Sequence, residues 1–344
     1  MDLIEIQKKI VPEILDMLEI RYNILRTIYY NQPIGRRGLA NKLDIGERTV
    51  RTEVNILKQQ GLLNIESMGM YITKDGKTVI GSLEGIIREL KGIEHLEQRL
   101  EDILKVKNVI IVPGNCDNNE LVLKDLGKAA SNYLIKVIKD GCIIGVTGGS
   151  TIAKVAEEMP QGKVANDILV IPARGGLGKD VDTQSNSIAA KLAKKLEGNY
   201  RLLHVPDSID KKTLEAMLQV KEVREVIQYF DKMNVLLFGI GRADVMGRRR
   251  QLSEEQIDML LHKGAVGEAF GHYFDINGFE VWKSLSVGID LDVFRKIETV
   301  IGVAGGENKA EAIMAIASLR DNMTLVIDEA AANRIIKLVD EATK

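Results

Sequence analysis

Cysteine is nearly absent from this 344-residue chain, which contains only Cys116 and Cys142. Two cysteines so placed form neither a disulfide framework nor a metal-ligand spacing, and the four histidines are scattered without an H-x-x-x-H pair. Disulfide-rich secreted domains and zinc motifs are therefore excluded. The sequence predicts a reduced compartment and no bound metal.

Long hydrophobic runs and an excess of one charge are also missing. No stretch reaches the roughly 18 uninterrupted apolar residues of a membrane-spanning helix, and the N-terminus lacks a signal-peptide pattern. We therefore expect a cytoplasmic protein with no membrane partner. The formal net charge is −2, so the chain as a whole is not a basic nucleic-acid binder, and any such function must be local.

The composition is otherwise that of a globular protein, with 45% hydrophobic and 28% charged residues, and the length favours two domains. The pattern predicts a DNA-binding domain of residues 1–83, a linker helix of residues 84–105 and an effector domain of residues 106–344. Apolar residues recur every three or four positions in the linker. That seam suits either a coiled coil pairing the subunits of a dimer or tetramer, or a helix lying on its own domain.

A helix-turn-helix pattern occupies residues 36–63, after helical patterns in residues 1–20, with a break or start at Pro12, and in residues 21–31. Its apolar spacing predicts helices at about 37–43 and 47–59 around the turn Asp44-Ile45-Gly46. Arg and Asn on the second helix are side chains that read guanine and adenine edges. The predicted DNA-contacting residues are Arg36, Arg37, Arg48, Thr49, Arg51, Thr52, Asn55 and Lys58.

Two further observations favour double-stranded operator DNA as the partner of this domain. Short β-rich runs flank Met68-Gly69 and predict the wing of a winged helix-turn-helix. Residues 26–77 hold nine Lys and Arg against five Asp and Glu, a local surplus that suits phosphate contacts. A three-helix domain that binds protein is the alternative.

From Val106 onward, short apolar runs alternate with helical patterns. Continuous rather than alternating apolar runs indicate strands buried on both faces, so we predict a doubly wound, mostly parallel α/β sheet. Residues 264–289 are more irregular and predict a hairpin. The predicted strands are 108–114, 142–149, 168–176, 201–206, 234–241, 300–306 and 324–330.

The run CIIGVTGGST, residues 142–151, reads as a strand, a glycine turn and a helix start. Such a turn presents backbone N–H groups at the positive end of a helix dipole, so phosphate is a suitable occupant. The turn matches neither a Walker loop nor G-x-G-x-x-G. A tight turn with nothing bound is the alternative.

Polar residues gather at other predicted strand ends, where open α/β sheets bind ligands. Arg174, the run Arg248-Arg249-Arg250 and Lys309 supply cations suited to phosphate, and each is also compatible with a solvated surface. Glu268 and Asp244 are candidates for holding hydroxyls. No catalytic set is evident, so an enzyme is not predicted.

These segments together resemble the SorC-type sugar-binding transcriptional regulators over essentially the whole chain. The resemblance rests on the helix-turn-helix and on the segments IGVTGGST, VIPARGG, VIGVAGGENKAEAIMAI and TLVIDEAAA. PARGG, the triple-arginine run and GGENKAEAI carry a closer match to members that regulate glycolytic genes. The resemblance implies a repressor, and an effector domain folded like ribose-5-phosphate isomerase and glucosamine-6-phosphate deaminase.

The resemblance also implies an effector, fructose 1,6-bisphosphate or a related sugar phosphate, and no cofactor. One phosphate would meet Gly148, Gly149, Ser150 and Thr151. Arg249, Arg250 and Lys309 would hold the other, while Arg174, Gln184 and Glu268 would hold the sugar or assist. Two alternatives stay open: a sister regulator that senses a pentose or deoxyribose phosphate, and a sugar-phosphate isomerase or deaminase.

Overall fold

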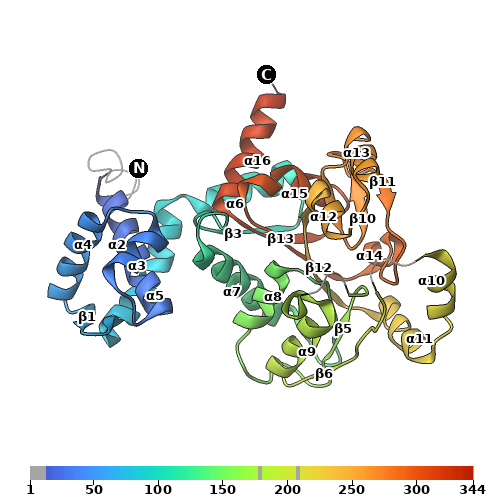
Figure 1. The fold of residues 1–344 in the computed structure, drawn as a ribbon, viewed down its shortest axis with the longest axis horizontal. Coiled ribbons are helices and arrows are strands. Elements are labelled where there is room, and N and C mark those ends of the chain that lie inside the picture. Colours follow the sequence, from blue (N-terminus) through green and yellow to red (C-terminus); the bar gives the residue numbers. More distant parts are fainter. Residues whose placement is uncertain (1–12, 177–179, 207–209, 344) are drawn as a thin grey trace. The chain divides into compact units, whose positions relative to one another are not determined.

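The computed structural model describes residues 13–176, 180–206 and 210–343. They form two compact units, which divide between His95 and Leu96 (Figure 1). The predicted helix in residues 1–12, with the break at Pro12, lies outside the described residues. None of the described helices has the length and hydropathy needed to cross a bilayer.

The N-terminal unit is a winged helix-turn-helix, as predicted. The two helices of the motif, α3 (Arg36–Leu43) and α4 (Glu47–Gln59), pack with α2 (Glu13–Asn31) and α5 (Lys74–Leu90). The wing is the antiparallel pair β1 (Leu63–Glu66) and β2 (Gly69–Ile72). Both motif helices begin and end within one residue of the predicted bounds.

The turn of the motif follows from local chemistry. Asp44 ends α3 in the left-handed region at φ 51, a conformation that Asp tolerates better than most residues. Val50, Val54 and Leu57 recur on one face of α4 and are fully buried or nearly so. Burial of that face fixes which residues of α4 face solvent.

The predicted linker helix of residues 84–105 is not continuous. Helix α5 ends at Leu90, and α6 (Ile93–Leu104) begins after Gly92, which has φ +63. A left-handed residue cannot extend a right-handed helix, and glycine adopts that conformation without a Cβ penalty. The apolar spacing continued across Gly92 and gave the false impression of one helix.

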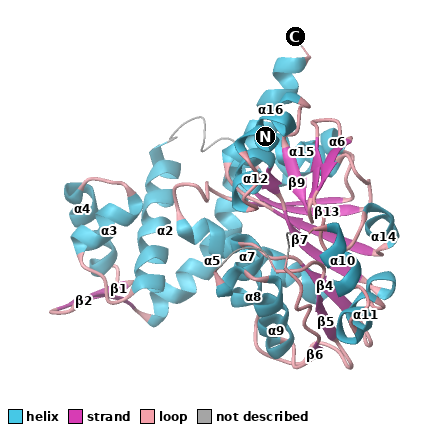
Figure 2. Ribbon diagram, turned by 45° about the vertical axis from the view of Figure 1, so that its right-hand side comes forward, coloured by secondary structure: helices cyan, strands magenta, loops and turns pink. Residues whose placement is uncertain are grey.

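The C-terminal unit contains a seven-stranded sheet in which every neighbouring pair is parallel (Figure 2). Helices flank it on both sides, which confirms the predicted doubly wound α/β architecture. The strands are β3 (Asn108–Val112), β4 (Ile143–Val146), β5 (Leu169–Pro172), β6 (Asn199–Tyr200), β7 (Val235–Gly239), β12 (Thr299–Val303) and β13 (Met323–Asp328).

The strand order is β3-β13-β12-β7-β4-β5-β6. From β4 the chain proceeds through β5 and β6 toward one edge, and from β7 it proceeds through β12 and β13 toward the other. The connections after β4 and β7 therefore diverge, and the crevice between their carboxyl ends is the place where doubly wound sheets bind ligands. One predicted strand, 201–206, is wrong, because the extended pairing lies at residues 199–200.

A second, four-stranded antiparallel sheet adjoins these strand ends. It has the order β11-β10-β9-β8. The predicted hairpin in residues 264–289 is confirmed as β9 (Gly267–Ala269) and β10 (His272–Phe274), to which β11 (Glu280–Lys283) adds, and β8 (Gly241–Arg242) completes the sheet. This sheet carries Glu268 into the molecule, where it is buried.

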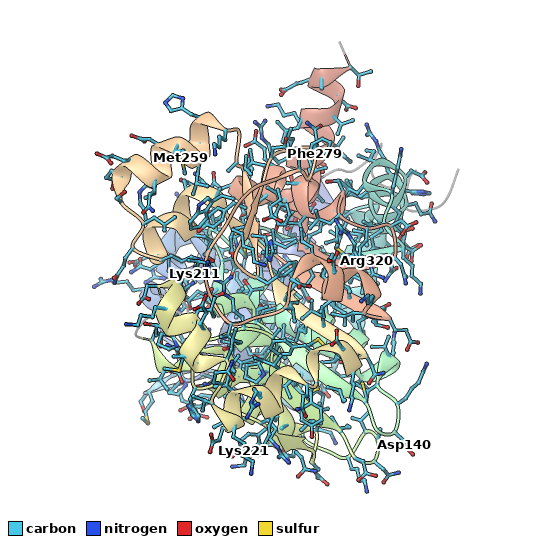
Figure 3. The ribbon with its side chains drawn as sticks, turned by 90° about the vertical axis from the view of Figure 1, so that its right-hand side faces the viewer. Asp140, Lys211, Lys221, Met259, Phe279 and Arg320 are labelled. Carbon is cyan, nitrogen blue, oxygen red and sulfur yellow. The ribbon has the colours of Figure 1, made fainter. Side chains whose placement is uncertain are left out.

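The remaining helices mostly follow the predicted alternation. Two short helices, α10 and α11, follow one another between β6 and β7. On the outer surface of this unit, Met259 and Phe279 are exposed (Figure 3). The helices are α7 (Glu120–Val137), α8 (Ser150–Glu158), α9 (Ser185–Lys195), α10 (Lys211–Met217), α11 (Lys221–Ile227), α12 (Ala243–Arg249), α13 (Glu254–His262), α14 (Leu291–Lys296), α15 (Ala310–Ala317) and α16 (Glu329–Ala342), with 3-10 turns at Val181–Thr183, Phe230–Lys232 and Glu307–Lys309.

Candidate functional site

A cavity of about 250 Å³ lies at the carboxyl ends of β4 and β7, where the strand order diverges. Nine of the ten predicted effector-binding residues line it, so the fold brings together segments far apart in the sequence. These nine are Gly148, Gly149, Ser150, Thr151, Arg174, Arg249, Arg250, Glu268 and Lys309.

The glycine turn after β4 leads directly into α8. Gly149 is the N-cap of α8 at φ +121, a conformation that side-chain-bearing residues rarely adopt, and it has no side chain to cap the helix. The first N–H groups of a helix have no intrahelical partner, and the helix dipole makes this end positive. Because this end of α8 opens into the cavity, the turn is suited to hold an anion.

The turn is fixed from behind by close backbone packing. The Gly149 N–H donates to the Thr183 carbonyl at 2.9 Å. A Cβ on Gly148 would lie 2.8 Å from the same oxygen, so no side chain fits there. The Thr147 hydroxyl accepts the Gly239 N–H at 3.1 Å, which ties the ends of β4 and β7 together. These contacts hold the turn in shape before any ligand arrives.

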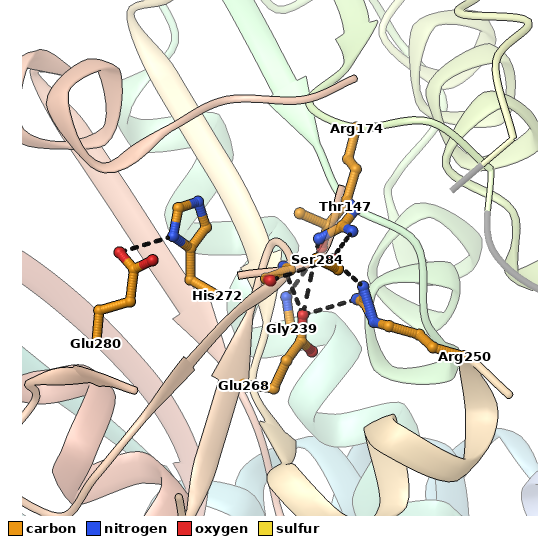
Figure 4. A network of polar contacts seen from close by, with 9 residues as sticks. Thr147, Arg174, Gly239, Arg250, Glu268, His272, Glu280 and Ser284 are labelled. Atoms are coloured by element: carbon orange, nitrogen blue, oxygen red, sulfur yellow. Dashed lines mark hydrogen bonds and ion pairs between the residues drawn. The ribbon is translucent and has the colours of Figure 1, made fainter. Parts of the chain in front are cut away.

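A buried cluster of two arginines and one carboxylate lines the same cavity as the turn (Figure 4). Arg250 Nη2 donates to Glu268 Oε1 at 2.7 Å, and Arg174 Nη1 lies 4.0 Å from the same oxygen. All three side chains are no more than 6% exposed. Glu268 Oε1 also accepts the Gly271 N–H at 2.6 Å, which holds the carboxylate in place.

Two of the three charged groups in this cluster are guanidinium groups that line the cavity. Arg174 and Arg250 bring two positive charges, and Glu268 brings one negative charge. Buried charge is costly unless it is balanced, because water that would otherwise solvate it is excluded. Because Arg174 and Arg250 line the cavity, the cluster is suited to an anionic ligand.

The three arginines of the run Arg248-Arg249-Arg250, at the end of α12, have different surroundings. Arg250 is buried in the cluster, and Arg249 lines the cavity and donates to the Thr183 hydroxyl at 3.3 Å. Arg248 is outside the residues lining the cavity and lies 3.5 Å from Asp244. Asp244, considered for hydroxyl binding, is also outside the lining, because it forms a bidentate pair with Arg242 at 2.9 and 3.0 Å.

Burial of Asp244 alone would raise its pKa. The hydrogen bond and charge of Arg242 outweigh that effect and hold the pKa of Asp244 below its ordinary value. Asp244 is therefore ionised and directs Arg242, whose guanidinium lines the cavity. Arg242 is a cation at the site that the sequence did not single out as an effector contact.

Lys309 enters the cavity from the turn that follows β12. Burial lowers its pKa, while the thiol and carboxylates of Cys116, Asp117 and Asp328 act in the opposite direction. The turn itself is anchored by the buried Asp328 carboxylate, whose Oδ2 accepts the N–H groups of Gly306 and Cys116, both at 2.8 Å. Lys309 is thus a half-buried amine on a fixed turn.

Gln184 is the one predicted effector residue outside the cavity lining. It is the N-cap residue of α9, and its Oε1 approaches the position that a Cβ on Gly176 would occupy. Its contact with a sugar stays a prediction. The predicted contacts did not include four other lining residues, Thr147, Thr183, Ser185 and Phe270. Thr147 belongs to the predicted turn and Ser185 to a predicted helix start, but no local signal marks Thr183 or Phe270.

The predicted DNA-contacting face of α4 is exposed as a single surface. Val50 and Val54 point into the core, and the opposite side of the helix faces solvent. Arg36 and Arg37 begin α3, where the Arg37 Nε lies 3.1 Å from Glu47 Oε1. The exposed predicted residues on α4 are Arg48, Thr49, Arg51, Thr52, Asn55 and Lys58.

Comparison with known proteins assigns a family to both units. The CggR N-terminal DNA binding domain family matches residues 17–87, and a sugar-binding domain family matches residues 88–337. The chain is 40% identical over 335 residues to the central glycolytic genes regulator of Bacillus subtilis, covering 97% of this chain and 98% of that protein. It is 37% identical over 340 residues to the protein of the same name from Priestia megaterium, with coverage of 97% and 98%.

Solved structures agree with this assignment. A SorC family transcriptional regulator from Enterococcus faecalis is 36% identical, with a TM-score of 0.66 and coverage of 70% of this chain and 99% of that one. The full-length sorbitol operon regulator of Klebsiella pneumoniae, 21% identical, shares the fold with a TM-score of 0.65 and coverage of 90% and 96%. A DNA-binding unit followed by a sugar-binding unit is the arrangement of a regulator and not of an enzyme. The chain therefore belongs to the SorC-type family of sugar-binding transcriptional regulators.

Proposed function

We propose that this protein is a repressor of glycolytic genes and that fructose 1,6-bisphosphate is its inducer. This choice of effector is supported by two groups of residues in one cavity that are each suited to bind an anion. The first is the helix start at Gly149, and the second is the group of cations Arg249, Arg250 and Lys309. A ligand with a phosphate at each end of a sugar would use both groups at once. The names of the relatives that are 37% and 40% identical support glycolytic genes as the target.

In this binding mode one phosphate accepts hydrogen bonds from the N–H groups at the start of α8 and from the hydroxyls of Ser150 and Thr151. The other phosphate meets Arg249, Arg250 and Lys309. Arginine supplies two parallel donors to phosphate oxygens and lysine supplies a point charge, so the set is well suited to a dianion. Glu268, Arg174 and Gln184 hold the sugar or assist the phosphates.

Operator recognition is assigned to α4 and the wing. An exposed face bearing Arg48, Arg51 and Asn55 suits base edges in the major groove, and Arg36 and Arg37 suit the flanking phosphates. A single head of this size reads one half-site. We therefore propose a homo-oligomer, a dimer or a tetramer, that places two heads on two half-sites.

Induction follows from linkage between the two ligands. The sugar bisphosphate lowers operator affinity only in so far as it binds the DNA-free arrangement more tightly than the DNA-bound one. A coupling free energy of about 1–3 kcal/mol changes operator affinity by roughly 5- to 150-fold, which is sufficient for a metabolic switch.

Calorimetric titration tests the effector directly. The purified full-length protein is titrated with fructose 1,6-bisphosphate, fructose 6-phosphate and glucose 6-phosphate, and operator release is followed by fluorescence anisotropy with a duplex selected in vitro. We expect selective binding of the bisphosphate and dissociation of the DNA. Binding of a monophosphate alone would overturn this effector and favour a sister regulator. One relative, 25% identical, is named the deoxyribonucleoside regulator of Bacillus subtilis.

A further inference from the structure

Ser284 lies directly behind the two buried arginines and outside the set of residues that line the cavity (Figure 4). It follows β11, far in sequence from Arg174, and it is 5% exposed. Its position is set by its own backbone, because the Ser284 N–H donates to the Gly271 carbonyl at 2.9 Å. A serine at this place therefore does not touch a ligand, and its role must be sought in what it holds.

The Ser284 hydroxyl uses its full hydrogen-bonding capacity. It donates to the Gly271 carbonyl at 3.1 Å. Its oxygen accepts from Arg174 Nη2 at 2.5 Å and from Arg250 Nη1 at 3.3 Å. A hydroxyl has one donor and two lone pairs, so these three contacts account for all of them. One side chain thus links both guanidinium groups to the backbone of the small sheet.

Glu268 and Gly271 constrain the same two guanidinium groups that Ser284 contacts. Arg250 donates through Nη2 to Glu268 and through Nη1 to Ser284, so two of its three nitrogens have fixed acceptors. Gly271 leaves space for the other arginine, because a Cβ there would lie 1.4 Å from Arg174 Nη1. Glu268, Gly271 and Ser284 together fix where the two guanidinium groups point.

We propose that Ser284 is a positioning residue for the second phosphate. It orients Arg174 and Arg250 before the ligand arrives, and so sets the preference of the cavity for a bisphosphate over a monophosphate. This inference rests on the proposed effector and adds to it the residue that positions these arginines. Fixing a cationic group in advance spares the ligand the cost of ordering it, and loosely held sites lose affinity although every contact residue is present.

The test compares Ser284→Ala with Ser131→Ala. Ser131 is also fully buried and its hydroxyl donates to the Lys128 carbonyl at 3.0 Å, but it lies on α7 and outside the cavity lining, so it controls for loss of a buried hydroxyl. We expect Ser284→Ala to weaken fructose 1,6-bisphosphate binding about tenfold, since hydrogen bonds to charged groups are among the stronger ones. Fructose 6-phosphate binding, which relies on the α8 turn, should change less.

Ser284→Thr keeps the hydroxyl and should restore most of the preference for the bisphosphate. A purely structural role for Ser284 predicts instead that both sugar phosphates weaken alike, and that result would overturn the inference, as would unchanged bisphosphate affinity in Ser284→Ala. The wild-type titration judges the proposed effector separately. If the wild type binds no fructose 1,6-bisphosphate, inorganic phosphate serves as the probe instead. The rise in melting temperature that phosphate causes should then be smaller in Ser284→Ala than in the wild type, and unchanged in Ser131→Ala. Any other result overturns the inference.

Discussion

Glu97 Oε1 accepts the backbone N–H of Ile111 at 2.7 Å, so a side chain of α6 reaches the outer edge of the seven-stranded sheet. Glu101, one helical turn later, accepts the N–H of Val109 at 2.9 Å. The amides of alternate residues on edge strand β3 are thus covered by carboxylates of a helix, where another strand would otherwise pair. From Glu97 onward, α6 is part of the effector unit.

This relationship predicts a specific loss of stability. Replacing both Glu97 and Glu101 by Ala leaves two edge amides without their carboxylate acceptors, and each such bond is worth about 1–3 kcal/mol. We expect a lower midpoint of denaturant unfolding for the effector unit of the full-length protein. Gln98→Ala, an exposed change on the same helix, should leave that midpoint unchanged. Equal midpoints for the double variant and Gln98→Ala would show that the carboxylates contribute nothing.

Arg248 and Arg249 provide a matched pair for the effector site. Both are exposed and adjacent at the end of α12, so removing either should affect folding to a similar, small degree. Only Arg249 lines the cavity. We expect Arg249→Ala to weaken fructose 1,6-bisphosphate binding by roughly 10-fold or more, as befits a charged hydrogen bond, and Arg248→Ala to leave it unchanged in calorimetric titration. The reverse order would place the second phosphate elsewhere.

Lys309 makes ligand affinity depend on pH. Burial lowers its pKa, so Lys309 loses its proton below the pH of about 10.4 at which an ordinary lysine does. Fructose 1,6-bisphosphate favours the charged amine, and therefore affinity should fall as pH rises through the lowered pKa. The ligand loses its own second phosphate proton near pH 6, so titrations above that pH separate the effect of the amine from that of the ligand.

The Cys116 thiol beside Lys309 does not add to this pH dependence. Burial raises the pKa of Cys116 to about 12, so its thiol stays protonated. Titrations at increasing pH should show the decline in wild type, a weaker but flat affinity in Lys309→Ala, and a flat affinity in Lys309→Arg. An identical decline in Lys309→Ala would assign the titration to another group.

The accuracy of sequence-based prediction varied with the range of the interactions involved. The turn at Gly148 and the exposed face of α4 depend on neighbours within a few residues, and both were predicted. The break at Gly92 was missed because apolar spacing continues across it. Ser284 and Thr183 reach the site through the tertiary packing of distant segments, so no local pattern marks them. Arg248, Arg249 and Arg250 look alike in sequence, and only the end of α12 determines which of them faces the cavity.

Operator recognition by α4 can be separated from general attraction to DNA. Arg48, Arg51 and Asn55 are exposed on the face opposite the buried Val50 and Val54. Substituting Ala for Arg48 or Arg51 should cost about 1–3 kcal/mol in operator binding if the side chain reads a base.

The control is Arg37→Ala, which removes a cation at the start of α3 whose Nε lies 3.1 Å from Glu47 Oε1. A phosphate contact of this kind should weaken specific and random DNA alike and reduce the dependence of affinity on salt. Anisotropy titrations of each variant against operator and random duplexes, at several salt concentrations, measure both effects. If Arg48→Ala and Arg51→Ala also weakened both duplexes equally, α4 would lie along the backbone, and sequence recognition would have to come from the wing. All these variants should bind fructose 1,6-bisphosphate as the wild type does, because none of the substituted residues lines its cavity.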